Sequence, residues 1–184
     1  SGWPPIEFRE NDQTRGLVID LIDLLEQQLD YEFERVTLGE GEDPDAMMAE
    51  GNIDIIPAMP RTPERQDQYL FSRSYLSLPI ALVIRDDHRF VGDLSELRDE
   101  RVVVVGDMAA HEYLTRNHPR LTVETVSSTE EGLRRVSEGE MDIMVTQIPG
   151  VTYTVDRLGL DNLRISSITP YQYDLRLAVS TEEP

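Results

Sequence analysis

The chain alternates between stretches with a helical period and short, almost uniformly apolar stretches. Residues 17–29 are apolar at positions 18, 21, 22, 25 and 29, which is the spacing of one helix face. Capping signals predict further helices, because aspartate, threonine or serine precedes the first turn. On these signals we expect helices at 44–50 and 129–138, each followed by a glycine, and a short one from 63. Two more helices are expected at 109–117 and 149–158.

The short apolar stretches between these helices predict buried strands. Four consecutive valines at 102–105 indicate a strand that is covered on both faces. The remaining strands are expected at 53–56, 80–84, 121–126, 142–146, 163–168 and 175–179, with a polar connector at 85–92. Such alternation is typical of an α/β fold with mostly parallel sheets.

One helix-to-strand junction occurs twice, about half the chain apart. Residues 50–56 (EGNIDII) resemble residues 138–144 (EGEMDIM). The similarity is either chance between two junctions of the same kind or the sign of two lobes built on one plan. In open α/β sheets ligands bind beyond the carboxyl ends of the strands. With two lobes, residues 58–61 and 146–148 would therefore face each other across a cleft.

Composition excludes several kinds of function. The 184 residues carry 36 acidic and 17 basic side chains, a net charge of −19, which opposes binding to nucleic acid or to an anionic membrane. The chain has neither lysine nor cysteine. Schiff-base chemistry, thiol catalysis and cysteine metal sites are therefore excluded. The three histidines lack metal-ligand spacing, so we expect no metal and no cofactor.

An ordered set of motifs resembles a known family. The set begins with WPPIEF at 3–8 and GLVIDL at 16–21, continues through EGNIDII and RTPER at 61–65 to FSRSY at 71–75, and includes DLSEL at 93–97 and GEMD at 139–142. In this order the motifs resemble type II periplasmic solute-binding proteins of the polar amino-acid class, family 3. The detail is most similar to the Venus-flytrap sensing domains of bacterial membrane receptors such as sensor kinases.

The resemblance implies two α/β lobes that are joined by two crossing strands and close on a small ligand. Lobe 1 would comprise residues 1–84 plus 170–184, and lobe 2 residues 85–169. The family normally has a strand before the WPP motif and helices after the last strand, so lobe 1 is expected to be trimmed at both ends. The resemblance also implies a periplasmic location, a membrane segment elsewhere in a longer chain, and a possible homodimer.

Lobe 1 would supply most of the ligand contacts. Arg65 matches the family arginine that forks onto a ligand carboxylate, a planar donor suited to that group. Trp3 matches an aromatic that lies over the ligand, and Met59 belongs to the same end of the lobe. Pro60 falls where amino-acid binders carry a hydroxyl. Arg61 is either a second cation for the ligand or an exposed loop residue.

Lobe 2 departs further from the amino-acid binders. Gln147 falls where they place an aspartate for the ligand ammonium, and a neutral amide cannot replace that charge. Met108 supplies no hydroxyl. Asp107 either adds charge to the site or simply belongs to a turn. These changes count against a zwitterionic amino acid and leave uncharged or anionic ligands open.

The sequence therefore predicts a non-enzymatic, extracytoplasmic domain that closes on a small polar ligand, most simply one with a carboxylate. A free, transport-associated binding protein is one alternative. A degenerate module that binds no ligand and serves dimerisation is another. A dehydratase-like enzyme with Asp107 or His111 as acid or base is the least favoured.

Overall fold

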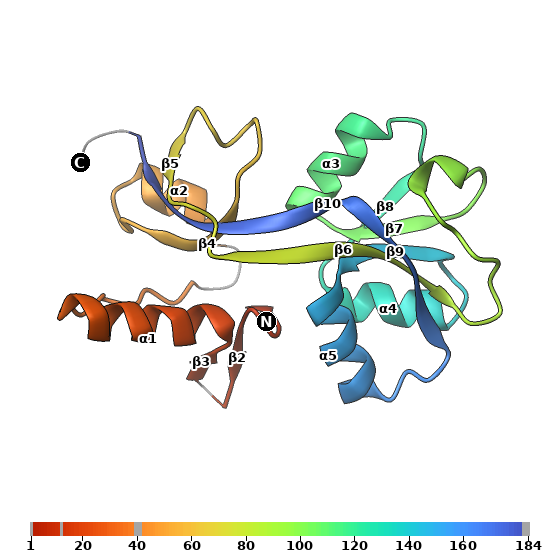
Figure 1. Cartoon of the computed structure of the whole chain (residues 1–184), viewed down its shortest axis with the longest axis horizontal. Helices are drawn as coiled ribbons and strands as arrows, with labels where there is room; N and C mark the ends of the chain where they lie inside the picture. The colour runs from red at the N-terminus through yellow and green to blue at the C-terminus, as the bar shows by residue number, and fades with distance from the viewer. Residues whose placement is uncertain (1, 12, 39–41, 182–184) are drawn as a thin grey trace.

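Two lobes joined by two long strands make up the molecule (Figure 1). The structure is a computed structural model, and it describes residues 2–11, 13–38 and 42–181. The joining strands are β6 (Leu76–Arg85) and β10 (Leu163–Ser180). We call the half that contains the N-terminal elements lobe 1 and the other half lobe 2.

Lobe 1 combines a small antiparallel sheet, two helices and two short strands. The small sheet has the order β1-β2-β3. The elements are β1 (Gly2–Trp3), β2 (Glu7–Glu10), β3 (Gln13–Arg15), α1 (Leu17–Leu29), α2 (Pro44–Ala49), β4 (Ile56–Pro60) and β5 (Tyr69–Phe71).

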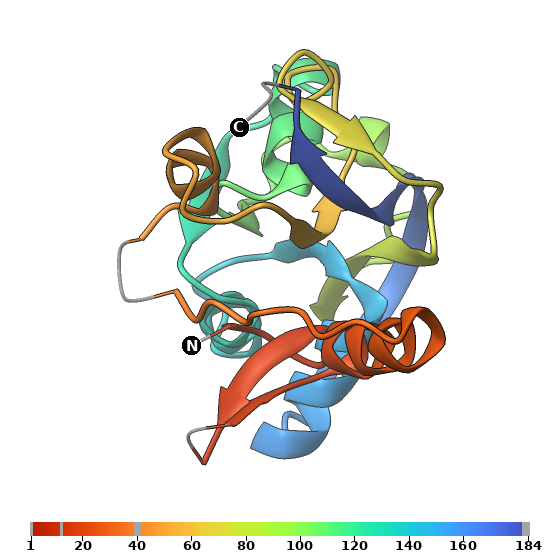
Figure 2. The ribbon, with the colours of Figure 1, turned by 90° about the vertical axis from the view of Figure 1, so that its left-hand side faces the viewer.

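Lobe 2 alternates strands and helices after a single 3₁₀ turn. Its elements are η1 (Leu94–Glu96), β7 (Val102–Val105), α3 (Ala109–Asn117), β8 (Val123–Val126), α4 (Thr129–Ser137), β9 (Ile143–Gln147) and α5 (Ile148–Leu158). In both views α1 and the β1–β3 sheet lie on the same side of the joining strands as α5, whereas α2 and α3 lie on the opposite side (Figures 1 and 2).

The large sheet is mostly antiparallel, so the expectation of mostly parallel sheets is wrong. Its order is β4-β10-β6-β9-β7-β8, and β5 also pairs with β10. Among these pairs β7 is parallel to β8 and to β9. The remaining pairs involve β6 or β10 and are antiparallel. The alternation of helix and strand correctly indicated the parallel part of lobe 2 but could not show that two strands return between the lobes.

Strand β10 is one strand where the sequence suggested two. It pairs with β6 from Leu163 to Leu175, with irregular register between Ile165 and Ser167 and again between Ile168 and Gln172. Pairing along β6 keeps the polar middle of the strand extended, although its sequence contains a proline and lacks an apolar pattern. A pairing partner that is distant in sequence therefore determined this element.

Two other predicted elements also differ. The predicted helix after Thr62 is a hydrogen-bonded turn, in which the backbone N–H groups of Arg65 and Gln66 both donate to the Thr62 carbonyl, at 3.1 Å each. The strand predicted at 53–56 begins only at Ile56. The backbone before it is still tied to the preceding helix, because Asn52 N–H donates to the Met47 carbonyl at 2.8 Å.

Both copies of the repeated junction have the same local structure. After α2, Gly51 N–H donates to the Met48 carbonyl at 3.0 Å, and after α4, Gly139 N–H donates to the Val136 carbonyl at 3.1 Å. The two glycines have φ angles of 73° and 81°, which suit a residue without Cβ. That residues 58–61 and 146–148 face each other across a cleft stays a prediction.

The main hydrophobic core continues from one lobe into the other. It contains Ile6 and Val18 of lobe 1, Leu82 of β6, and Val102 and Ile143 of lobe 2. Smaller clusters lie under α4 and α5 in lobe 2 and around Met48 and Tyr69 in lobe 1. The two lobes therefore share packed apolar contacts in this state.

Asp142, at the second junction, ties β9 to the start of β7. The Arg101 side chain donates to its two carboxylate oxygens at 3.0 and 2.8 Å, and Arg101 N–H donates at 2.8 Å. The Arg101 side-chain hydrogen bonds lower the Asp142 pKa to about 2. The ionised carboxylate therefore stabilises the fold fully above the ordinary aspartate pKa of about 4, and this stabilisation is lost as the pH falls through about 2.

We predict that Asp142→Asn lowers the free energy of unfolding by about 1–2 kcal/mol at pH 7, because the amide keeps the shape but loses the ion pair. Urea unfolding at pH 7, 4 and 3 would show the difference from wild type shrinking at the lowest pH. Asp54 holds the corresponding place in the first junction and is exposed. Asp54→Asn is thus the matched control, and equal losses in both variants would contradict the prediction.

Candidate functional site

Arg65 reaches from the turn of lobe 1 to helix α3 of lobe 2. Its Nη2 donates to Oε1 of Glu112 at 2.9 Å, and the two side chains are 19% and 26% exposed. Glu64 and Asp67 are the carboxylates nearest to Arg65 along the chain, but the carboxylate that Arg65 binds comes from the other lobe. An arginine between the lobes thus already binds a carboxylate.

A second ion pair lies beside the first. Glu64 of lobe 1 pairs with Arg116, which follows Glu112 by one turn of α3. This pair is more exposed than the Arg65–Glu112 pair. The two neighbouring residues of the lobe 1 turn therefore contact two residues on one face of α3.

A row of aromatic rings lies along the hinge. Trp3 meets Tyr173 edge to face with ring centroids 5.7 Å apart, and Tyr173 meets Tyr171 in the same manner at 5.8 Å. Tyr171 in turn stacks on Tyr113 of α3 at 4.4 Å, with the two rings nearly parallel. The row connects the N-terminal strand, the hinge strand β10 and lobe 2, and Trp3 packs against Tyr173 within it.

The first turn of α3 is also hydrogen-bonded to the hinge strand β10. Ala110 N–H donates to the hydroxyl oxygen of Tyr173 at 2.9 Å. Burial raises the pKa of Tyr173, so its hydroxyl stays neutral. Burial, and then the nearby Glu112 carboxylate, raise the pKa of Tyr171 to about 12. Both tyrosines therefore hold neutral hydroxyls between the lobes at physiological pH.

Two polar atoms at this place are buried without a partner. Within the described parts of the chain, Thr62 Oγ1 and Glu112 Oε2 have no hydrogen-bond partner. Thr62 begins the turn that carries Arg65. Buried polar groups are normally paired, and an unpaired one costs about 1–3 kcal/mol. A hydroxyl and a guanidinium on one turn are suitable donors for a ligand carboxylate.

The other lobe 1 residues predicted for the site divide into two groups. Pro60 and Arg61 line a cavity of about 280 Å³ against the hinge residues 170–172, 174 and 176. Arg61 also donates to Gln66 Oε1 at 2.9 Å. Met59 is 4% exposed and packs in the smaller lobe 1 core. Its burial is explained by packing.

The lobe 2 residues serve local structure. Asp107 is exposed in the turn before α3 and has a φ of 57°. Met108 occupies the N-cap of that helix, and its carbonyl accepts from His111 N–H at 2.8 Å. Gln147 is 1% exposed and caps α5, where its Oε1 accepts from Gly150 N–H at 2.6 Å. Its Nε2 is buried and, among the described residues, without a partner.

The structure thus brings Trp3 and Arg65 to the contact between the lobes, while Met59 and Gln147 lie in packed interiors. As ligand contacts, all eight predicted residues stay predictions. Sequence reasoning missed Glu112, Tyr113, Tyr171 and Tyr173. The alternation Tyr171-Gln172-Tyr173 was a usable signal for two rings on one face of a strand. Nothing local pointed to Glu112, because its partner lies 47 residues away.

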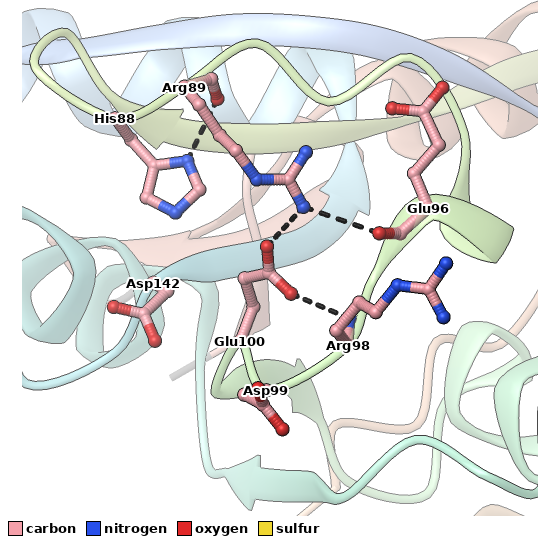
Figure 3. Close-up of a pocket in the computed structure, with 7 residues that line it drawn as sticks. All are labelled: His88, Arg89, Glu96, Arg98, Asp99, Glu100 and Asp142. Atoms are coloured by element: carbon pink, nitrogen blue, oxygen red, sulfur yellow. Dashed lines mark hydrogen bonds and ion pairs between the residues drawn. The ribbon is translucent and has the colours of Figure 1, made fainter.

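A larger, open cavity of about 680 Å³ lies on lobe 2 and is lined by charged side chains (Figure 3). Arg89 pairs there with Glu100 and donates to the Glu96 carbonyl, while Arg98 N–H donates to Glu100 Oε2 at 2.7 Å. These bonds hold the connector after β6 in place. Among the lining side chains, Arg89 pairs with Glu100, and Asp142 pairs with the neighbouring Arg101.

The described residues offer neither a metal-ion cluster nor a membrane-spanning helix. They contain no group of three or more His, Cys, Asp or Glu side chains placed to hold a metal ion. Among them, no helix has the length and apolar composition needed to cross a bilayer.

Comparison with known proteins identifies the family. The profile of the bacterial extracellular solute-binding proteins, family 3, matches residues 1–184. The chain belongs to this family. As a family 3 domain it is extracytoplasmic, and the fold expected from the sequence, the two-lobed Venus-flytrap arrangement, is confirmed.

Several family 3 relatives are sensor proteins. The Virulence sensor protein BvgS of Bordetella pertussis is 28% identical over 160 residues, which is 87% of this chain and 13% of BvgS. The periplasmic VFT2 domain of BvgS superposes with a TM-score of 0.83 at 26% identity, covering 96% of this chain and 76% of that domain. A histidine kinase sensor domain has a TM-score of 0.89 at 21% identity, covering 98% and 79%, which shows the fold alone.

One relative is named as an enzyme. The membrane-bound lytic murein transglycosylase F of Idiomarina loihiensis is 27% identical over 150 residues, which is 78% of this chain but only 33% of that protein. The match is thus confined to a part of the transglycosylase. Family 3 as a whole is described by solute binding.

Proposed function

We propose that this family 3 domain is the sensing domain of a bacterial membrane receptor, and that a small carboxylate-bearing ligand binds between its lobes at Arg65. The observation that carries the proposal is the Arg65 guanidinium, which is mostly buried between the lobes and already binds a carboxylate at 2.9 Å. A planar guanidinium in a desolvated cleft is a strong donor to such a group. Thr62 Oγ1, buried on the same turn, would add a second donor.

The receptor context rests on the sensor relatives. The chain spans 13% of the length of BvgS. We therefore propose that it is part of a longer protein that also contains a membrane segment and a kinase domain. A homodimer is proposed on the same basis. Closure would carry a signal only to the extent that the ligand binds one state more tightly than the other.

The sequence predicted lobe 1 as 1–84 plus 170–184 and lobe 2 as 85–169; we propose this division with the first boundary moved back along β6 to just before Ile80. The irregular register of β10 between Ile168 and Gln172 supports a crossing near 170. On the other joining strand, Ile80 already pairs with β9, so that crossing would lie a few residues before 84.

A second candidate function is a module that binds no ligand. It is favoured because groups that could bind a ligand already have partners within the chain. Arg65 binds Glu112, and the Ala110 N–H donates to the Tyr173 hydroxyl. In this case closure would be permanent and the domain would act through contacts with other chains. A free, transport-associated binding protein remains the alternative within the ligand-binding class.

We expect a thermal-shift screen against amino acids, dicarboxylates and aromatic acids to separate these functions. A ligand at a hundred times its Kd adds about 2.7 kcal/mol, which raises the Tm by about 5–10 °C. Arg65→Ala should abolish the shift. Arg73→Ala, an exposed lobe 1 arginine, should retain it. A shift that survives Arg65→Ala would contradict the proposed anchor, and no shift with any acid would favour the non-binding module.

A further inference from the structure

Two ion pairs of opposite polarity join the turn of lobe 1 to α3. Glu64 and Arg65 are neighbours in the turn, and their partners Arg116 and Glu112 are one helical turn apart. We call these four residues the interlobe clasp. The negative and positive side chains of the lobe 1 turn thus each face a side chain of opposite charge on α3.

This arrangement fixes how the lobes meet. Residues four apart on a helix project from the same face, so Glu112 and Arg116 can both reach lobe 1 at once. A shift of one helical turn would bring like charges together. The Arg65–Glu112 pair is also shielded from water, and shielding strengthens an ion pair relative to an exposed one.

We propose that the interlobe clasp holds the two lobes closed without any ligand, and that Glu112 is an internal carboxylate which a ligand must displace from Arg65. Of these two statements, only the displacement of Glu112 by a ligand rests on the proposed function. The clasp makes closure the resting state of the domain. Ligand binding then exchanges one carboxylate on Arg65 for another and frees α3 from the lobe 1 turn.

The state of Glu112 supports this exchange. Its Oε1 accepts from Arg65, while its Oε2 is buried and has no partner in the described parts of the chain. Glu112 therefore uses one oxygen where a forked guanidinium can engage two. A free carboxylate that engages both would bind Arg65 more completely, and the released Glu112 would regain water.

The first test measures closure in the absence of ligand. Because the chain has no cysteine, Ala49→Cys at the end of α2 and Thr122→Cys before β8 can be spin-labelled without a background signal. Neither residue has a side-chain contact in the clasp. Pulsed electron–electron double resonance then gives the distribution of distances between the two spin labels, one on each lobe.

We expect one narrow distance for the parent pair. Adding Glu64→Gln and Glu112→Gln should populate a second, different distance, with the fraction of open molecules rising roughly tenfold or more. Exchanging the charges of the less exposed pair, with Arg65→Glu and Glu112→Arg, should restore the narrow distribution. Glu124→Gln is the matched control, since Glu124 pairs with Arg135 inside lobe 2, also at 2.9 Å.

Circular dichroism and urea unfolding establish that each variant is folded before its distances are compared. An unchanged distribution in Glu64→Gln/Glu112→Gln would overturn the clasp. The clasp would also be overturned if Glu124→Gln opened the lobes equally, or if the exchanged pair left them open.

The second test measures displacement, with succinate and glutamate as probes. Calorimetric titration should give a Kd about five- to tenfold lower for Glu112→Gln than for wild type, because the internal competitor has lost its charge. Weaker binding by Glu112→Gln would show that Glu112 assists the ligand, which overturns displacement. If neither protein binds either acid, displacement and the proposed carboxylate ligand both fail, while the distance measurement still decides the clasp.

Discussion

Replacing Leu82 with alanine is expected to lower the free energy of unfolding by about 3 kcal/mol, and the Tm by about 6–12 °C. Leu82 lies in β6 between Val145 of β9 and Ser167 of β10 and is fully buried. Its removal leaves a cavity in the core that both lobes share, and the flanking strands cannot collapse into it without breaking their pairing. Urea unfolding followed by circular dichroism measures the loss.

Leu70→Ala provides the matched control for this change. Leu70 lies in β5 and is 61% exposed, so its truncation should cost less than about 0.5 kcal/mol. Because the core continues between the lobes, Leu82→Ala should also keep one cooperative transition. Equal losses for the two leucines, or a second transition in Leu82→Ala, would contradict this account of the core.

Gly16→Ala is expected to cost about 3 kcal/mol, the second large effect. Gly16 stands before α1 with a φ of 127°, a conformation that other residues rarely adopt. An added Cβ would lie 2.3 Å from the Ile6 carbonyl oxygen, the same oxygen that accepts from Val18 N–H. The backbone there must shift, so α1 loses its attachment to the β1–β3 sheet.

Gly51→Ala separates the clash from the backbone conformation. Gly51 also has a positive φ, of 73°, but nothing lies within 4 Å of its added Cβ. Its substitution should therefore cost only the strain of the left-handed conformation, about 1 kcal/mol. Hydrogen exchange should show faster exchange in α1 for Gly16→Ala alone. If the two substitutions proved equally costly, the close approach of Ile6 would not be the cause.

Elements with local signals were predicted well from the sequence. Helix α1 has the predicted bounds, Leu17–Leu29, because its apolar period is a property of the segment itself. Ser128 caps α4 as expected, because its hydroxyl oxygen accepts from Glu131 N–H, and Ser127 N–H donates to the Glu131 carboxylate. Such signals act within a few residues, so no knowledge of the fold is needed to interpret them.

Features that depend on distant partners were not predicted. The middle of β10 is extended because β6 pairs with it, and that pairing cannot be inferred from a stretch containing Pro170. The candidate site shows the same limit. The motif identified Arg65, but its carboxylate partner comes from α3, and only the approach of the two lobes brings Glu112 to it.

Because of the row of rings along the hinge, the intrinsic fluorescence of the protein should change when the lobes move. Trp3 is the only tryptophan of the chain and lies edge-on to Tyr173, next to the stacked Tyr171 and Tyr113. Excited tyrosines at such separations pass their energy to tryptophan efficiently. Parting α3 from the hinge strand would carry Tyr113 away from Trp3, while Tyr171 and Tyr173 would stay beside it on β10. The loss of the Tyr113 contribution to Trp3 emission would therefore follow lobe movement in unlabelled protein and in real time.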